Sequence, residues 1–144
     1  MTTIDYGSDL SCVSDLTPHM LVVSGNRLVA EAIARRLQTP KGALLDDSNY
    51  GYDVTGLINA DIGPGDLGRI AAGITAECQK DQRVFSASVD VEWAVVGPSF
   101  GQVPGFPSGS GYLAITISLV LGSGPFTLVL AASQVTVAIL QTGT

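Results

Sequence analysis

Apolar and polar residues alternate with a period of two through most of the second half of the chain, which is typical of β-strands with one face in a core. After Arg83, the apolar positions are Phe85, Ala87, Val89, Val91 and Trp93, with Ser86, Ser88, Asp90 and Glu92 between them. The stretch 112–121 alternates in the same way, and an apolar run follows at 126–140. The pattern therefore predicts three long strands, the last two joined by a turn at 122–125.

The first half of the chain has helical periodicity at two places. The two apolar stripes consist of Leu28, Ala32, Ile33 and Leu37, and of Leu67, Ile70, Ala71, Ile74 and Cys78. Their spacing predicts helices over 26–38 and 66–80. Ser24 or Asn26 is expected to cap the first helix, and Asp66 the second.

The other segments are predicted to be irregular. Residues 1–19 are expected to form an N-terminal arm that leads into one short strand at 20–25. Residues 39–59 are interpreted as a folded loop with one helical turn, and the Gly-, Pro- and Ser-rich stretch 97–111 as a long flexible loop. Helices followed by strands indicate an α+β fold: two main helices packed on a small, mostly antiparallel β-sheet with long C-terminal strands. The length of 144 residues is expected to form a single domain, 1–144.

The composition is compatible with a binding partner and disfavours some classes of partner. Hydrophobic residues make up 46% of the chain and charged residues 14%, so much of the surface is expected to lack charge. The net charge of −6 disfavours nucleic acid and anionic membranes. The N-terminus has no basic segment followed by an apolar one, and the run at 126–140 is short for a membrane span, so we expect a cytosolic protein.

No arrangement of residues in the sequence indicates a catalytic centre, so we do not expect an enzyme. His19 is the sole histidine, and Cys12 and Cys78 lie in no metal-ligand spacing, so neither a metal nor a cofactor is expected. A small peptidoglycan hydrolase remains an alternative because acids such as Glu31, Glu77, Asp81 and Glu92 could act in pairs. Glu31 can pair with Arg35 four residues on, and Arg83 is a candidate basic partner for Asp81.

A set of short motifs in the middle of the chain resembles one known family. The helix near 26–38 ends in a Leu-x-Thr-Pro-x-Gly signature, a Tyr-Gly turn follows, and an acid-x-Arg triplet joins the second helix to the first long strand. The matching residues are Leu37, Thr39, Pro40, Gly42, Tyr50, Gly51, Asp81, Gln82 and Arg83. In these features the chain resembles the sheath-initiator family of baseplate proteins from contractile phage tails and related injection systems, once described as lysozyme-like. The family has Glu-Pro-Arg where this chain has Asp81-Gln82-Arg83, so the proline is missing here.

The resemblance implies a structural role in a tail baseplate that is assembled in the host cytoplasm. It implies six copies around the tail tube, contacts with baseplate wedge and hub proteins, and β-strand augmentation that nucleates the contractile sheath. An equivalent part of a secretion or extracellular injection machine is the alternative. The residues expected to contact partners are Asp81, Gln82, Arg83, Tyr50, Gly51, Tyr112, Ile115, Ile117, Val135 and Val137. Whether 112–121 or 126–140 supplies the docking edge stays open at this point.

Overall fold

A computed structural model describes residues 4–12, 16, 18–60, 62–95, 111–133 and 137–143 of the chain. The fold is α+β, with a two-stranded and a four-stranded antiparallel sheet. In chain order the elements are β1 Ser8–Leu10, β2 Val22–Ser24, α1 Gly25–Arg36, α2 Val54–Asn59, a 3-10 turn Pro64–Asp66, α3 Leu67–Gln79, β3 Val84–Val95, β4 Gly111–Leu121, β5 Gly124–Ala132 and β6 Val137–Gly143. The predicted fold class and both main helices are confirmed.

The four-stranded sheet is a meander in the order β3-β4-β5-β6. The single strand predicted at 126–140 is therefore wrong: its apolar residues form β5 and β6, which pair antiparallel. The reason lies in the register of β4, because Leu113 already pairs with Ala132 and β4 begins at Gly111. A longer β5 would extend past the end of β4 and have no strand to pair with. The chain instead reverses direction, and β6 pairs with the free edge of β5.

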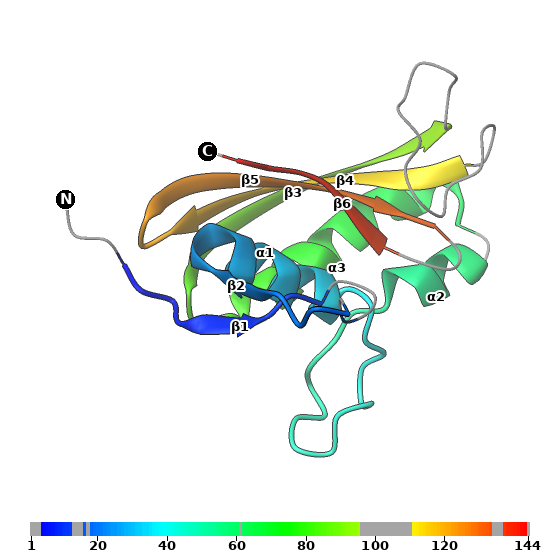
Figure 1. The fold of residues 1–144 in the computed structure, drawn as a ribbon. Helices are drawn as coiled ribbons and strands as arrows, with labels where there is room; N and C mark the ends of the chain where they lie inside the picture. The colour runs from blue at the N-terminus through cyan, green and yellow to red at the C-terminus, as the bar shows by residue number, and fades with distance from the viewer. Residues whose placement is uncertain are drawn as a thin grey trace.

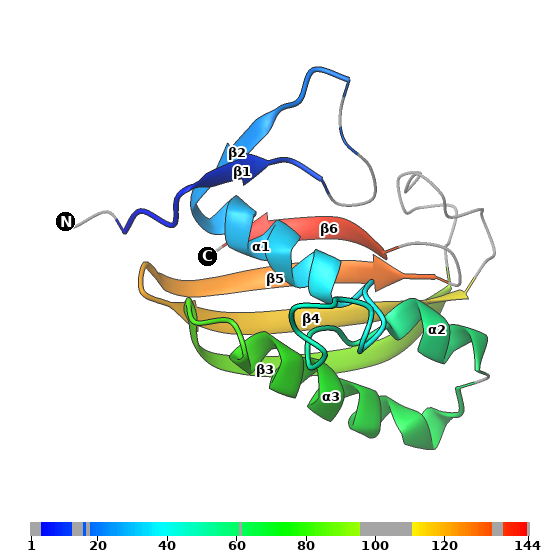
Figure 2. The same cartoon turned by 90° about the horizontal axis from the view of Figure 1, so that it is seen from below.

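The helices cover one face of this sheet (Figures 1 and 2), with α1 packed near β5 and β6 and α3 near β3. The alternating apolar residues of β4 and the apolar stripes of α1 and α3 are buried between the two layers. The buried set includes Ile33, Leu37, Ile70, Ile74, Leu113, Ile115, Ile117, Leu119, Leu128 and Leu130. The sheet thus presents one face to the core, as the period-two pattern predicts.

Two of the expected core residues of β3 are exposed instead. Phe85 is 72% exposed because a register shift lies between Val84 and Ser86, and Val84 opposes Leu121 in its place. A β-bulge of this kind adds one residue to a strand and so reverses the facing of its neighbour. Trp93 is 53% exposed because it lies near the end of β3, where it borders an open apolar pocket and not the closed core.

The N-terminal arm contains more structure than predicted. β1 pairs with β2 in a hairpin that lies beside α1, apart from the main sheet (Figure 2). The buried Glu31 accepts hydrogen bonds from the Cys12 amide at 3.0 Å and from Arg27 Nε at 3.1 Å. Arg35 instead pairs with Asp9 at 3.4 Å, so the predicted Glu31–Arg35 ion pair is wrong. Within the described ranges, no helix is long and apolar enough to cross a membrane.

Candidate functional site

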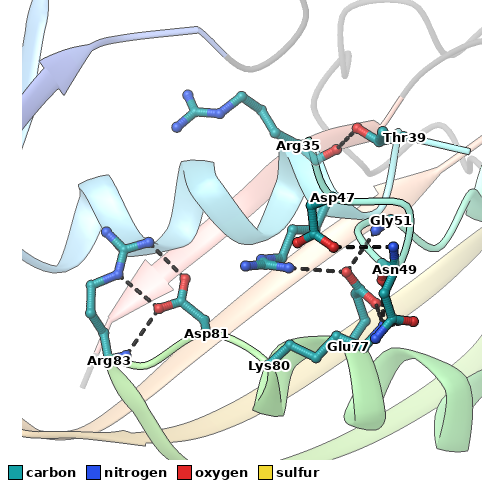
Figure 3. A network of polar contacts seen from close by, with 10 residues as sticks. Arg35, Thr39, Asp47, Asn49, Gly51, Glu77, Lys80, Asp81 and Arg83 are labelled. Carbon is teal, nitrogen blue, oxygen red and sulfur yellow. Dashed lines mark hydrogen bonds and ion pairs between the residues drawn. The ribbon is translucent and has the colours of Figure 1, made fainter. Parts of the chain in front are cut away.

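The strongest cluster of polar contacts lies where the end of α1, the loop 39–53 and the end of α3 meet (Figure 3). Its centre is the carboxylate of Glu77, which is 2% exposed. Glu77 Oε1 accepts hydrogen bonds from the Gly51 amide at 2.8 Å and from Arg36 at 3.1 Å, and Oε2 accepts one from Lys80 Nζ at 2.7 Å. One buried carboxylate therefore connects two helices and the loop between them.

The loop is fastened to α1 at several points as well. Thr39 Oγ1 donates to the carbonyl of Arg35 at 2.7 Å, and the Tyr52 amide donates to the carbonyl of Arg36 at 3.0 Å. The Arg36 guanidinium also lies over the ring of Tyr50, 4.4 Å from its centre. Such a cation–π contact adds to the ion pair that Arg36 makes with Glu77.

Gly51 is required by the way the loop returns to the helix. Its φ is +110°, and a Cβ at this position would lie 2.3 Å from the carbonyl oxygen of Thr39. A side chain would therefore clash with backbone and would also be strained by the positive φ. The Thr-Pro-x-Gly and Tyr-Gly motifs of the sequence are thus in contact, since Thr39 and Gly51 touch each other.

Asp81 and Arg83 form a second cluster at the corner between α3 and β3. Arg83 Nε donates to Asp81 Oδ1 at 2.9 Å and Arg83 Nη2 to Oδ2 at 2.6 Å, so the ion pair is bidentate. The Arg83 amide also donates to Asp81 Oδ1 at 3.0 Å, and the Val84 amide to the carbonyl of Asp81 at 3.0 Å. The predicted Asp81–Arg83 pair is confirmed. It lies in a β-turn that the bond from the Val84 amide closes and in which Gln82 is the second residue.

The two acids of these clusters are held in their charged forms. Burial alone would raise the pKa of Glu77, but the hydrogen bonds from Lys80, Gly51 and Arg36 outweigh it and lower the pKa. Burial would likewise raise the pKa of Asp81, but hydrogen bonds from the side chain and the amide of Arg83 outweigh this effect, so the pKa is lowered. The Asp81 carboxylate in turn raises the pKa of Arg83. Both acids are arranged to hold chain segments together at neutral pH.

Three of the four acids named for the hydrolase alternative, Glu31, Glu77 and Asp81, are engaged in internal contacts. A general acid in glycoside hydrolysis needs a raised pKa, whereas Glu77 and Asp81 have lowered ones. Glu31 has both oxygens occupied by hydrogen bonds from Ser11, Cys12 and Arg27. The neighbouring Cys78 is unsuited to act as a nucleophile, because burial raises its pKa to about 12. Among the residues that the structure describes, no group of His, Cys, Asp and Glu could hold a metal.

The structure brings together one half of the predicted contact residues. Asp81, Gln82 and Arg83 form the corner, and Tyr50 and Gly51 lie in the loop beside Glu77 and Lys80. Gln82 is exposed, and the side chain of Arg83 is 29% exposed, so a partner can reach this corner.

Three of the other five predicted contact residues need correction. Ile115 and Ile117 are fully buried and Tyr112 is nearly so, and all three lie in β4, which pairs with β3 on one side and β5 on the other. Since an inner strand has no free edge, these three residues cannot offer one to a partner. Val137 is buried in β6. Val135 and residues 97–110 lie outside the described residues, and Gly111 begins β4.

Sequence reasoning missed the central roles of Arg36, Glu77 and Lys80. One signal for Glu77 is present: it lies three residues after Ile74, on the face of α3 that the apolar stripe marks as buried. A buried acid needs partners, and cations near both helix ends could supply them. A comparison of the chain with models of known families, with curated proteins and with solved structures found no match.

Proposed function

We propose that this protein is a baseplate component that nucleates the sheath of a contractile tail or of a related injection machine. The observation that carries the proposal is the convergence of the motifs on which the family resemblance rests. Thr39, Tyr50 and Gly51 meet around Arg36 and Glu77, although they come from opposite ends of the loop 39–53. A sequence signature shared by a family is expected to mark residues that contact one another and hold the same part of the fold together.

The sheet supports strand augmentation through one of its two edges. β3 is an edge strand, but it carries Asp90 and Glu92, and such charges discourage pairing with another strand. β6 is the opposite edge strand, and its sequence VAILQTG contains no charged residue and no proline. The proposed docking edge for the sheath strand is therefore β6, because main-chain hydrogen bonds can form there without placing a charge beside the incoming strand.

The second part of the proposed role is to fix the sheet relative to the baseplate. The contacts of Glu77 with the loop 39–53, and of Asp81 with Arg83, suit this role. The Asp81–Arg83 pair sets the path from α3 into β3, and Glu77 sets the path from α1 to α3. A strand offered to a partner has to be presented at one angle, and ion pairs between successive elements restrict that angle. Wedge proteins are proposed to contact the exposed side of this corner at Gln82 and Arg83.

Electron micrographs of particles assembled without the protein test the proposal. The expected result is baseplates or tail tubes that lack an extended sheath, with sheath protein forming free polysheaths or staying unassembled. Restoring the protein in trans should restore the sheath. Extended sheaths of normal length on complete baseplates in its absence would show that the proposed function is wrong.

A further inference from the structure

The loop between α1 and α2 carries the most exposed apolar side chain of the described chain at its tip. Leu45 is 101% exposed and Leu44 is 43% exposed. The loop extends away from the sheet, beyond the layer of helices (Figure 1). Burying a leucine side chain against another apolar surface is favourable, because it removes apolar area from water. The two adjacent leucines on this projecting loop therefore expose apolar surface that this chain does not bury by itself.

Hydrogen bonds along the loop hold this tip in place. At the base, Thr39 is bound to α1 and the Gly51 amide to Glu77. Nearer the tip, the Ala43 amide donates to the carbonyl of Pro40 at 3.1 Å. On the returning side, the amides of Asn49 and Tyr50 donate to the side chain and the carbonyl of Asp47, at 3.1 and 3.2 Å. A loop with this many internal bonds loses less conformational entropy when it binds.

Charge indicates what kind of surface the tip fits. Asp46 and Asp47 follow the leucines and are exposed, and among the described residues neither forms an ion pair with a basic side chain. Six of the seven basic residues form ion pairs with other acids. The seventh, Lys41, is exposed on the other side of the leucines in the same loop, next to Pro40, whereas both acids directly follow Leu45. The tip therefore combines an apolar centre with an acidic border, and its complement is an apolar pocket bordered by lysine or arginine.

We propose that the tip at 44–47 is an anchor that inserts Leu45 into an apolar pocket, bordered by basic residues, on a different protein. This inference does not depend on the proposed function, because it rests on the exposure, attachment and charge of the loop. It also differs from the β6 edge and the Asp81–Arg83 corner in location, so one protein could use all three surfaces together.

Photo-crosslinking tests the anchor in the cells that make the protein from its native locus. We would replace Leu45 with p-benzoylphenylalanine, and Arg69, whose side chain is 72% exposed on α3, as the matched control. The expected result is one dominant product from position 45, joined to a different protein at an apolar site flanked by Lys or Arg, and none from position 69. Adding Asp46→Lys should lower the yield about tenfold, since like charges would then face each other.

Three outcomes would overturn the inference. They are no product above the level of the Arg69 control, a product between two copies of this chain, and a crosslinked site without basic residues nearby. Because Leu45 and Asp46 are both exposed, neither change should alter the melting temperature of the purified full-length protein, which separates lost binding from lost folding. If crosslinking shows that Leu45 is not an anchor, the proposal of sheath nucleation still stands, because the micrographs that test it do not depend on position 45.

Discussion

At the scale of single residues, Glu77 is the side chain on which the junction of α1, the loop and α3 depends most. Three donors approach its two oxygens, and the side chain of Arg36, one of the three, is only 15% exposed. Removing the acid would leave a largely buried guanidinium without its charge partner. Breaking such a pair is more costly than losing a surface ion pair.

Glu77→Gln is therefore expected to lower the free energy of unfolding by about 3 kcal/mol. The amide cannot accept hydrogen bonds from all three donors, and it carries no charge to balance Arg36 and Lys80. Urea denaturation of the purified protein measures the change. Glu92→Gln, on the exposed face of β3, is the matched control and should stay within about 0.5 kcal/mol of the original protein. Equal effects of the two substitutions would contradict the central role of Glu77.

Gly51 provides a test of the close approach between the loop and α1. Gly42 has a φ of +90°, and no atom lies within 4 Å of where its Cβ would be, whereas Gly51 combines a φ of +110° with backbone at 2.3 Å. Gly42→Ala should therefore cost only the strain of a positive φ, about 1–2 kcal/mol. Gly51→Ala should cost clearly more, as measured by denaturation. If both variants lost the same stability, the clash with Thr39 would not be a constraint on the fold.

At the scale of the elements, the corner between α3 and β3 is a tight turn that an ion pair, and not a proline, restricts. Gln82 is the second residue of a β-turn closed by the bond from Val84 to Asp81. Proline is favoured at that position of type I and type II turns. The bidentate Asp81–Arg83 pair, with the Asp81 side chain also accepting from the Arg83 amide, restricts the same turn by different means.

Gln82→Pro should consequently be tolerated and should raise the free energy of unfolding by about 0.5 kcal/mol. The gain is expected because proline restricts the unfolded chain, and no hydrogen bond in the described structure uses the Gln82 amide. Arg83→Ala is the contrasting variant and should destabilise the corner by removing the partner of a 6% exposed carboxylate. A loss of more than about 1 kcal/mol in the proline variant would show that the turn cannot take proline at position 82.

The elements also show what could be predicted from the sequence. Helical periodicity placed α1 and α3 to within about two residues, because each helix buries a continuous apolar stripe. The bulge at Phe85 could not be predicted, since one extra residue reverses the facing of a strand without changing its composition. The division of 126–140 into β5 and β6 depended on the length of β4, and the contacts of Glu77 depended on the packing of α3 against the loop. Both are properties of the assembled molecule.

At the scale of the whole molecule, the buried ion pairs predict how stability depends on pH. The pKa values of Glu77 and Asp81 are lower in the folded protein than their ordinary values, so the unfolded chain binds more protons at acidic pH. Stability should be fully present above about pH 5 and should fall as the pH decreases below the ordinary range of these acids, about 4. Denaturation curves between pH 7 and pH 3 measure this, and Asp81→Asn should flatten the decrease. A stability that stays constant down to pH 3 would contradict the assignment.

The most direct test of the central claim is hydrogen exchange of the full-length protein with and without the purified sheath subunit encoded in the same genome. Docking of a sheath strand on β6 predicts slower exchange of amides in 137–143, and unchanged exchange in β3, the edge that carries Asp90 and Glu92. Protection of β3 with no change in β6 would contradict the proposed edge. No protection of either strand at saturating sheath subunit would contradict sheath nucleation by strand augmentation.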